Sequence, residues 1–373
     1  MAQLVARRYG IPKVASSSLA GSTNAPPFLR GGANLKKCLK FKVPYKMLKN
    51  SSKIKVAIVG AGTIGLYLAW KLSQAGHKVI VFEKNSKILA KPCSGLISER
   101  LKNYISLDNS LIENKINCCL VHFPRKTIIL NFKPVHYLIN RQKLNEKLAQ
   151  LTENAGAEIL FNHLVDEIPQ GFDKVIGSDG ALSKIRKKLG LPQPSFRLGL
   201  QIFIPQQPAA EELEQVEVWP IQNGFFWRIP RTNGTEYGLI DSPETALSNF
   251  KKLLFHYRSY DLGKLGKVLE ERKTALIPSS LVLPKNKNIT LSGDAAGLTK
   301  PWSGGGVIWG LRAAEILIKN FPDFEKYHQE IKKFFGPKIL KGKFSTHLTY
   351  FLGNHFPYVL PSKISRDNDF PIF

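Results

Sequence analysis

Short apolar runs alternate with amphipathic segments over residues 53–195, which is the pattern of an α/β fold with a parallel sheet. Apolar residues at spacings of three and four predict helices at Thr63–Gln74 and Arg141–Ala155. Shorter runs predict the strands Lys55–Val59, Lys78–Phe82, Gly156–Phe161 and Phe172–Ile176. Because strands and helices alternate, we expect a Rossmann-like domain in this part of the chain.

The pattern changes near residue 196, where short extended segments replace the helices. Leu198–Ile204 and Gln215–Trp219 alternate in polarity, and they predict a separate antiparallel sheet. Leu120–Phe132 likewise predicts two strands joined by a turn. Toward the C-terminus we expect a core strand at Asn288–Leu291 and helices at Gly305–Lys319, Phe324–Phe335 and Lys338–Phe351.

These elements predict an α/β architecture in which a Rossmann-like domain is interleaved with an antiparallel-sheet substrate domain and followed by C-terminal helices. The expected boundaries are 53–195 for the first part of the Rossmann-like domain, 196–285 for the substrate domain, 286–320 for a segment that returns to the first domain, and 321–373 for the helical region.

The N-terminal segment 1–52 is different in kind, because the first acidic residue of the chain is Glu83. Its arginines, serines and Pro/Gly pairs match a transit peptide in composition, in which case the protein is imported into an organelle. Met47 lies just before the first strand, so initiation there is a second interpretation. A disordered basic tail that touches a membrane is the third.

The formal net charge is +26, with lysine and arginine spread along the chain. No nucleic-acid-binding motif is present, so we expect no nucleic-acid partner. A basic surface favours anionic lipid headgroups or phosphorylated substrates, and a solvated lysine-rich surface is the alternative. The four cysteines show neither CxxC nor metal-ligand spacing, and the adjacent Cys118 and Cys119 are expected to fill a strand rather than form a disulfide. We expect a reducing, cytoplasmic setting and no metal.

The sharpest chemical signal follows the first predicted strand, where Gly60, Gly62 and Gly65 have GxGxxG spacing. The first glycine allows a tight turn, the second lets backbone approach a pyrophosphate, and the third lets the helix pack closely on the strand. Glu83 ends the second strand about 20 residues later, where an acid takes the ribose hydroxyls. With strand, helix and acid in register, a dinucleotide site is favoured over a cluster of packing glycines.

Three further glycine-bearing segments lie at Pro92–Gly95, Gly177–Gly180 and Gly293–Gly297. In flavin-binding proteins, the dinucleotide site is typically formed by an early glycine motif together with two segments from much later in the chain. Over about residues 53–350 the layout resembles the p-hydroxybenzoate-hydroxylase-type flavoproteins. Within them it is most similar to the geranylgeranyl reductase family, especially its archaeal digeranylgeranylglycerophospholipid reductases.

The resemblance implies a Rossmann-like FAD-binding domain with FAD as the cofactor. The segment from Gly177 to Arg186 matches the family's GADGxxSxxR motif, with Ser178 in place of alanine. In that family a late Gly-Asp motif places its aspartate against the flavin's ribityl chain, and the helix after it points its N-terminus at the pyrimidine ring. Gly293 and Asp294 match this motif here. The FAD-binding residues implied in this way are Gly60, Gly62, Gly65, Glu83, Arg141, Asp179, Gly180, Asp294, Gly305 and Gly306.

Two segments narrow the resemblance to the reductases. Pro92–Gly95 is similar to their Cys-Gly-Gly motif, with Ser94 in place of a glycine, and it implies that Cys93 is a catalytic proton donor or a flavin-gating residue. Phe225–Pro230 is similar to their aromatic YxWxFP segment, which lines a lipid tunnel. It implies that Phe225, Trp227 and Pro230 bind substrate. The residues alone leave open a buried structural role for the cysteine and plain sheet packing for the aromatic residues.

The implied activity is the FAD-dependent reduction of C=C double bonds in geranylgeranyl chains of an isoprenoid ether-lipid precursor, with hydride from reduced flavin N5. Such a bond has no carbonyl to polarise, so the site must position it and exclude water. The alternatives are a chlorophyll-type geranylgeranyl diphosphate reductase, an FAD-dependent monooxygenase of the same fold, and a lipid-binding relative without flavin.

The chain has no second GxGxxG unit, so either NAD(P)H or ferredoxin can be the electron donor. No run approaches the ~18 apolar residues of a spanning helix, and we expect peripheral association with a membrane surface. An aromatic-rich C-terminal stretch is the hypothesised contact, formed by Tyr350, Phe351, His355, Phe356 and Tyr358.

Overall fold

The computed structural model describes residues 53–205, 208–258 and 269–371. They belong to a unit that spans Lys53–Phe373. The N-terminal segment 1–52, with Met47, Cys38 and the three interpretations given above, lies outside the described residues.

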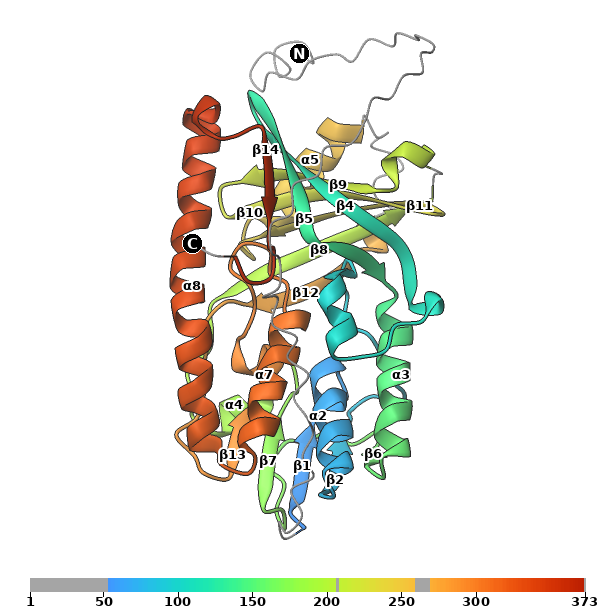
Figure 1. Cartoon of the computed structure of the whole chain (residues 1–373), viewed down its shortest axis with the longest axis vertical. Helices are drawn as coiled ribbons and strands as arrows, with labels where there is room; N and C mark the ends of the chain where they lie inside the picture. The colour runs from blue at the N-terminus through green and yellow to red at the C-terminus, as the bar shows by residue number, and fades with distance from the viewer. Residues whose placement is uncertain (1–52, 206–207, 259–268, 372–373) are drawn as a thin grey trace, which may run out of the picture. The chain divides into compact units, whose positions relative to one another are not determined.

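In the described part of the chain, a five-stranded parallel sheet has the order β13-β7-β1-β2-β6 (Figure 1). Val56 and Ile58 of β1 point into one core and Ala57 and Val59 into another, so the strand is buried on both faces as predicted. The strands are β1 (Lys55–Val59), β2 (Lys78–Phe82), β6 (Glu158–Leu160), β7 (Lys174–Gly177) and β13 (Ile289–Leu291).

Helix α2 (Thr63–Gln74) packs against α3 (Arg141–Asn154) and α7 (Val307–Asn320) on one side of this sheet. The residues of α2 are those that the sequence predicts, and the other two helices differ from the prediction by one or two residues at their ends. The short helix α4 (Lys184–Lys188) follows β7. The predicted Rossmann-like arrangement is confirmed.

A second sheet, of nine strands among the described residues, has the order β12-β8-β11-β10-β9-β4-β5-β14, with β3 paired to β5. Most neighbours are antiparallel, as expected, but β4–β9 and β5–β14 are parallel pairs, so the sheet is mixed. Its strands are β3 (Leu96–Ser98), β4 (Ile112–Phe123), β5 (Lys126–Ile139), β8 (Phe196–Ile204), β9 (Gln215–Ile221), β10 (Gly224–Arg231), β11 (Gly234–Asp241), β12 (Lys273–Pro278) and β14 (Lys363–Arg366).

This sheet takes strands from well outside residues 196–285. The hairpin β4–β5 falls within residues 53–195, which we predict to be Rossmann-like, and β14 falls within the region that we predict to be helical. The hairpin joins the second sheet because β4 pairs with β9, almost 100 residues later in the chain. A pairing between strands so far apart leaves no local signal in the sequence.

The C-terminal helix α8 (Phe324–His355) is a single helix of 32 residues, whereas we predicted two segments divided at Pro337. Proline removes one backbone hydrogen bond and its ring crowds the preceding turn. The helix continues because both halves are packed. Phe335 is buried against Trp309 before the proline, and Gly342 lies against Trp302 after it.

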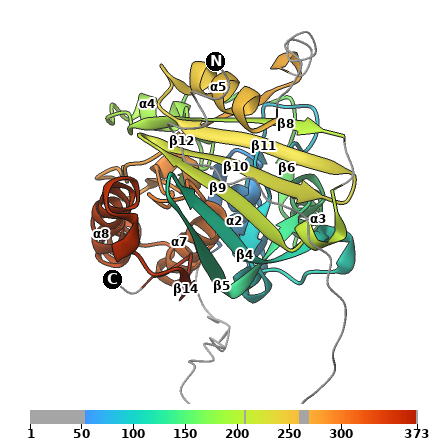
Figure 2. The same cartoon turned by 90° about the horizontal axis from the view of Figure 1, so that it is seen from above.

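The two faces of the second sheet have different neighbours. Helix α5 (Ala246–Arg258) covers one face, where Phe250 and Leu254 pack on Phe226 and Leu200 (Figure 2). The other face carries a second apolar cluster that includes Trp227. Within the residues that the structure describes, no helix is long and apolar enough to cross a membrane. Short 3-10 helices complete the chain at Glu99–Asn103, Asn109–Leu111, Ala210–Glu212, Gly293–Ala296 (η4) and Pro357–Val359.

Candidate functional site

A cavity of about 1040 Å³ is lined by residues from both sheets and from the segments that connect them. Of the fourteen residues that the sequence singled out, twelve line this cavity, and Gly65 and Pro230 do not. Segments more than 200 residues apart in the chain therefore meet at one place. The twelve are Gly60, Gly62, Glu83, Cys93, Arg141, Asp179, Gly180, Phe225, Trp227, Asp294, Gly305 and Gly306.

The three glycines after β1 have three different environments. Gly60 has φ +103° and a Cβ there would lie 2.6 Å from the Ser178 carbonyl oxygen, so the turn requires glycine. A Cβ on Gly65 would lie 2.0 Å from the Gly60 carbonyl oxygen, which makes Gly65 a packing residue between helix and strand. Gly62 has nothing within 4 Å of that position, and it opens α2 with no side-chain cap among the described residues. Bare backbone N–H groups at the cavity wall are the arrangement that binds a pyrophosphate.

Glu83 lies at the end of β2 and connects it to the glycine turn. Its Oε2 accepts a hydrogen bond from the Ala61 N–H at 2.8 Å, and its Oε1 accepts one from the Asn85 N–H at 2.9 Å. The side chain is buried, yet it lines the cavity. A carboxylate has about four acceptor sites, so it retains capacity for a hydroxyl group.

The middle motif connects the glycine turn to the late Gly-Asp motif. Asp179 Oδ2 accepts the Lys184 N–H at the start of α4 at 2.7 Å, while its buried Oδ1 has no partner among the described residues. Arg186 is completely buried, and its Nη1 donates to the Ala295 carbonyl oxygen in η4 at 2.8 Å. The arginine of this motif thus ties α4 to the Gly-Asp turn.

Asp294 lies in η4 at the cavity wall, where its carboxylate pairs with the Lys91 ammonium at 2.5 Å. Its Oδ1 is close to the following glycine loop, because a Cβ on Gly306 would lie 3.1 Å from it. Gly306 is also the N-cap of α7 and has no side-chain cap in the described structure. A second bare helix N-terminus therefore faces the same cavity as that of α2.

Cys93 and Arg141 lie where the glycine turn meets the second sheet. The Arg141 guanidinium lies 3.7 Å from Cys93 Sγ and donates to Thr63 Oγ1 at 2.5 Å, and its buried Nε has no partner in the described residues. The Arg231 guanidinium donates to the Ser94 carbonyl oxygen at 2.6 Å. Cys93 is exposed to the cavity rather than buried, so its environment favours a chemical role over a packing role. Cys118 and Cys119 are free thiols on β4, as expected.

The aromatic strand β10 contributes one face to the cavity and the other to the core under α5. Phe225, Trp227 and Ile229 line the cavity, and the Trp227 ring lies over Gly238, where a Cβ would be 2.0 Å from it. Pro230 does not line it, contrary to the prediction, because side chains alternate along a strand. Ile229 takes the place that we assigned to the proline.

Apolar side chains of β4, β5, β9, β11 and β12 extend this wall. The sequence shows the alternation of these residues but not which face meets the cavity, since that depends on the pairing of distant strands. The cavity-lining side chains concerned are Cys119, Val121, Leu130, Phe132, Val216, Val218, Ile240 and Ile277. His163, to which the sequence assigned no role, also lines the cavity next to Glu83.

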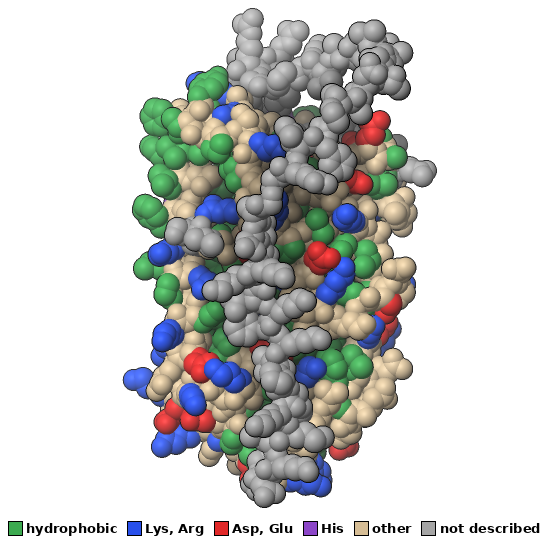
Figure 3. Space-filling model, in the orientation of Figure 1, with side chains coloured by type: hydrophobic (Ala, Val, Ile, Leu, Met, Phe, Trp, Pro, Cys, Tyr) green, Lys and Arg blue, Asp and Glu red, His purple; other side chains and the backbone are tan. Residues whose placement is uncertain are grey.

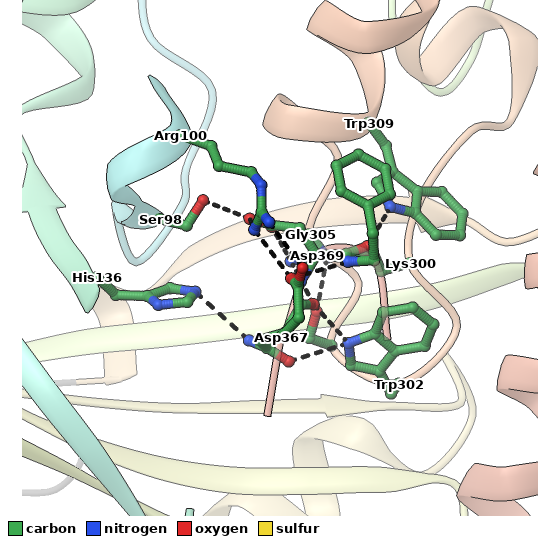
Figure 4. Close-up of polar contacts among 12 residues, drawn as sticks. Ser98, Arg100, His136, Lys300, Trp302, Gly305, Trp309, Asp367 and Asp369 are labelled. Carbon is green, nitrogen blue, oxygen red and sulfur yellow. Dashed lines mark hydrogen bonds and ion pairs between the residues drawn. The ribbon is translucent and has the colours of Figure 1, made fainter. Parts of the chain in front are cut away.

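A buried polar cluster from the C-terminal tail forms another part of the wall (Figure 4). The Lys300 ammonium lies 3.0 Å from Asp369 Oδ1, and Ser98 donates to the other carboxylate oxygen. Trp302 Nε1 donates to Asn368 Oδ1 at 3.1 Å, and Trp309 Nε1 donates to the Asp369 carbonyl oxygen at 2.8 Å. The tail thereby holds the loop that leads to Gly305. No motif in the sequence indicates this contact.

The charges of this cluster follow from its burial. Burial raises the pKa of Asp369, but the Lys300 ammonium, the Ser98 hydroxyl and His136 outweigh it and hold the pKa below its ordinary value. Burial, with the Lys300 charge, lowers the pKa of His136 to about 4. The carboxylate is therefore charged and the imidazole neutral at pH 7.

These features fit FAD. The cavity has two bare helix N-termini for phosphate and ring oxygens, an acid at the end of β2 for a ribose, and unpartnered buried polar atoms on Asp179 and Arg141. The same cavity also has an apolar wall, formed by the second sheet. The polar groups of the cofactor do not need such a wall, so it is available for a second, apolar ligand.

Known proteins show the same fold at low sequence identity. Residues 58–89 match the model of an NAD(P)-binding Rossmann-like domain. The chain is 25% identical to digeranylgeranylglycerophospholipid reductase 1 of Methanosphaera stadtmanae over 74% of this chain and 78% of that protein. It is also 25% identical to kynurenine 3-monooxygenase of Flavobacterium psychrophilum, over 72% and 73% of the two chains.

A solved structure of a geranylgeranyl bacteriochlorophyll reductase-like protein from Thermoplasma acidophilum superposes with a TM-score of 0.67. It is 20% identical and covers 79% of this chain and 87% of that one. The predicted flavoprotein fold is thus confirmed. In sequence the chain is a distant relative of geranylgeranyl reductases and kynurenine 3-monooxygenases, and a flavin-dependent brominase shares its fold with a TM-score of 0.63.

Proposed function

We propose that this protein reduces C=C double bonds in the geranylgeranyl chains of an isoprenoid ether-lipid precursor, with FAD as its cofactor. The observation that carries the proposal is the apolar wall formed by β4, β5, β9 and β10 in the cavity that the glycine loops share. A long hydrocarbon chain is the ligand that such a wall fits, because it offers many contacts and no charged partner.

The residues that would hold FAD are those at the polar end of the cavity. The N-termini of α2 and α7 would take the pyrophosphate and ring oxygens, Glu83 a ribose, and Asp294 the ribityl chain. When bound and reduced, FAD supplies the hydride for a double bond.

The protein's own residues supply position, dryness and a proton. Phe225, Trp227 and Ile229 would align the chain, and they exclude water from a bond that cannot be polarised. The Cys93 thiol can give a proton to the second carbon, and the Arg141 guanidinium, 3.7 Å from the sulfur, stabilises the thiolate that is left.

The test is anaerobic reduction of the purified holoprotein with dithionite, followed by a geranylgeranylated phospholipid. We expect the flavin spectrum to return to its oxidised form and the lipid mass to rise in steps of about 2 Da, one added H₂ for each bond. If the flavin stays reduced until oxygen is admitted, the lipid assignment is wrong and a monooxygenase is favoured.

Two cysteine variants sharpen this test. Cys93→Ala should retain bound FAD but lose lipid reduction by roughly a hundredfold, the usual contribution of a positioned acid. Cys118→Ala is the matched control, because this thiol lies on β4 but does not line the cavity. Equal lipid reduction by the two variants would show that Cys93 is not the proton donor.

A further inference from the structure

Helix α8 has one face in the protein and another that carries large apolar side chains in solvent. Leu340, Phe344, Leu348 and Phe351 follow the spacing i, i+4, i+8, i+11, so they share one face of the helix. Leu340 is 73% exposed and Phe344 is 69% exposed. The chain after the helix adds Phe356, Tyr358 and Val359, which are also exposed. We call these seven residues the α8 apolar face.

The opposite face of α8 is fixed to the protein by close backbone packing. A Cβ on Gly342 would lie 2.7 Å from the Trp302 ring, and one on Gly353 would lie 2.1 Å from the Phe123 ring. The helix cannot rotate to bury its apolar face without losing both contacts. In Figure 3, hydrophobic side chains gather over the upper half of α8, at the left of the view.

The segment that carries this face has charges of one sign. Residues 331–366 contain no aspartate or glutamate and seven basic residues. At 3.6 residues per turn, Lys341 and Lys343 fall on either side of the apolar stripe. An apolar stripe flanked by lysines and free of carboxylates is the pattern of a helix that lies in the surface of an anionic bilayer.

The α8 apolar face also adjoins the cavity through its own helix. Thr349 and Tyr350, on the same helical turns as Leu348 and Phe351, line the cavity. Because Tyr350 lines the cavity, its side chain faces inward and does not belong to the predicted interfacial contact; its burial raises the pKa of the phenol. A surface on which the helix rests would thus lie one helix diameter, about 10 Å, from the cavity wall.

We propose that the α8 apolar face docks the protein on the surface of an anionic membrane, with α8 lying in the plane of the headgroups. This inference rests on the proposed function, since it names where a lipid chain reaches the cavity. The apolar side chains enter the acyl boundary, and the flanking lysines pair with lipid phosphates. A second copy of this chain or the segment 1–52 in place of the membrane would be an outcome against the proposal, and the test below distinguishes them.

The experiment is flotation of the full-length holoprotein with vesicles of phosphatidylglycerol and phosphatidylcholine, and with phosphatidylcholine alone. We expect binding to the anionic vesicles that weakens as salt is raised. Phe344→Ser with Leu348→Ser should weaken it by roughly tenfold or more. Phe255→Ser is the matched control, because Phe255 is a 51% exposed phenylalanine on α5. Unchanged flavin absorbance and melting temperature confirm that the variants are folded.

Equal flotation of the two variants, or no flotation of the wild type, would overturn the proposal. Light scattering tests for a second copy on the face, which would appear as a dimer that Phe344→Ser with Leu348→Ser dissociates. Flotation of a variant without residues 1–46 tests the N-terminal segment, because vesicle binding gained on its removal would show that it covers the face. Activity on detergent-dispersed lipid separates the two claims. Reduction without flotation contradicts only the docking, and flotation without reduction contradicts only the proposed function.

Discussion

The polar end of the cavity depends on backbone geometry as well as on a few charged side chains, whereas the apolar end is a layer of side chains alone. At the polar end, Gly60, Gly62 and Gly65 matter because they lack a Cβ atom. The N–H groups of two helix ends face the cavity there, beside carboxylates such as those of Glu83 and Asp294. At the apolar end, the wall is the side-chain layer of a sheet, and the residue types are interchangeable as long as they fill the space. Backbone geometry therefore demands particular residues, while an apolar wall demands only a class of residue.

The largest expected effect is the difference in unfolding free energy between alanine variants of two glycines in the turn after β1. Gly65→Ala puts a Cβ 2.0 Å from the Gly60 carbonyl oxygen, and we expect a loss of more than about 5 kcal/mol of unfolding free energy or failure to fold. Gly62→Ala meets nothing within 4 Å, so its stability should change by less than about 1 kcal/mol. Its FAD affinity should fall instead. Urea unfolding and FAD titration measure the two effects, and similar changes in both variants would contradict these roles.

The next effect concerns the tail that closes the wall between the two ends. Asp369→Asn leaves the buried Lys300 ammonium without its counter-charge, which should cost about 3–5 kcal/mol of unfolding free energy. Asp367→Asn makes the same change two residues away, where the partner Arg100 is partly exposed to solvent, so the loss should be smaller, about 1 kcal/mol. Urea unfolding of both variants measures the difference. Equal destabilisation would show that the tail is held by its backbone contacts.

The apolar end allows a test within one strand. Phe226 is completely buried against Phe250 of α5, so Phe226→Ala should cost about 3–5 kcal/mol of unfolding free energy. Phe225→Ala removes a ring from the cavity wall and should cost less than about 1.5 kcal/mol, while the KM for a prenyl substrate rises. Chemical unfolding and steady-state kinetics report the two effects, and a reversed order would mean that the faces of β10 are exchanged.

The smallest effect expected from a single side chain is a dependence on pH. The folded pKa of His136 is about 4 against 6.5 for a free imidazole, so the unfolded chain binds more protons between these values. Stability should be full above pH 6.5 and should fall by up to roughly 3 kcal/mol as the pH drops to 4. His328 has the same shift and adds to the slope. His136→Phe should flatten the plot of unfolding free energy against pH, and an unchanged slope would contradict the assignment.

Local patterns predicted the parts of this molecule that local chemistry controls. The bounds of α2 and the strand β1 follow from the spacing of apolar residues, and the order of the glycine motifs indicated which segments meet. The exchange of Pro230 for Ile229 shows the limit, since alternation gives two faces but not the one that lines the cavity. The division predicted at Pro337 shows another, because packing on Trp309 and Trp302 compensates a local helix breaker.

By itself, the sequence determined the Rossmann-like domain, the glycine turn and the residue types around the cofactor site, because these depend on neighbours within a few residues and on backbone space. Only the tertiary structure decided that the hairpin β4–β5 belongs to the second sheet, that the tail residue Asp369 neutralises Lys300 beside the cavity, and that α8 keeps an apolar face outside. Such contacts join segments far apart in the chain, and the free energy that selects them comes from the burial of whole surfaces.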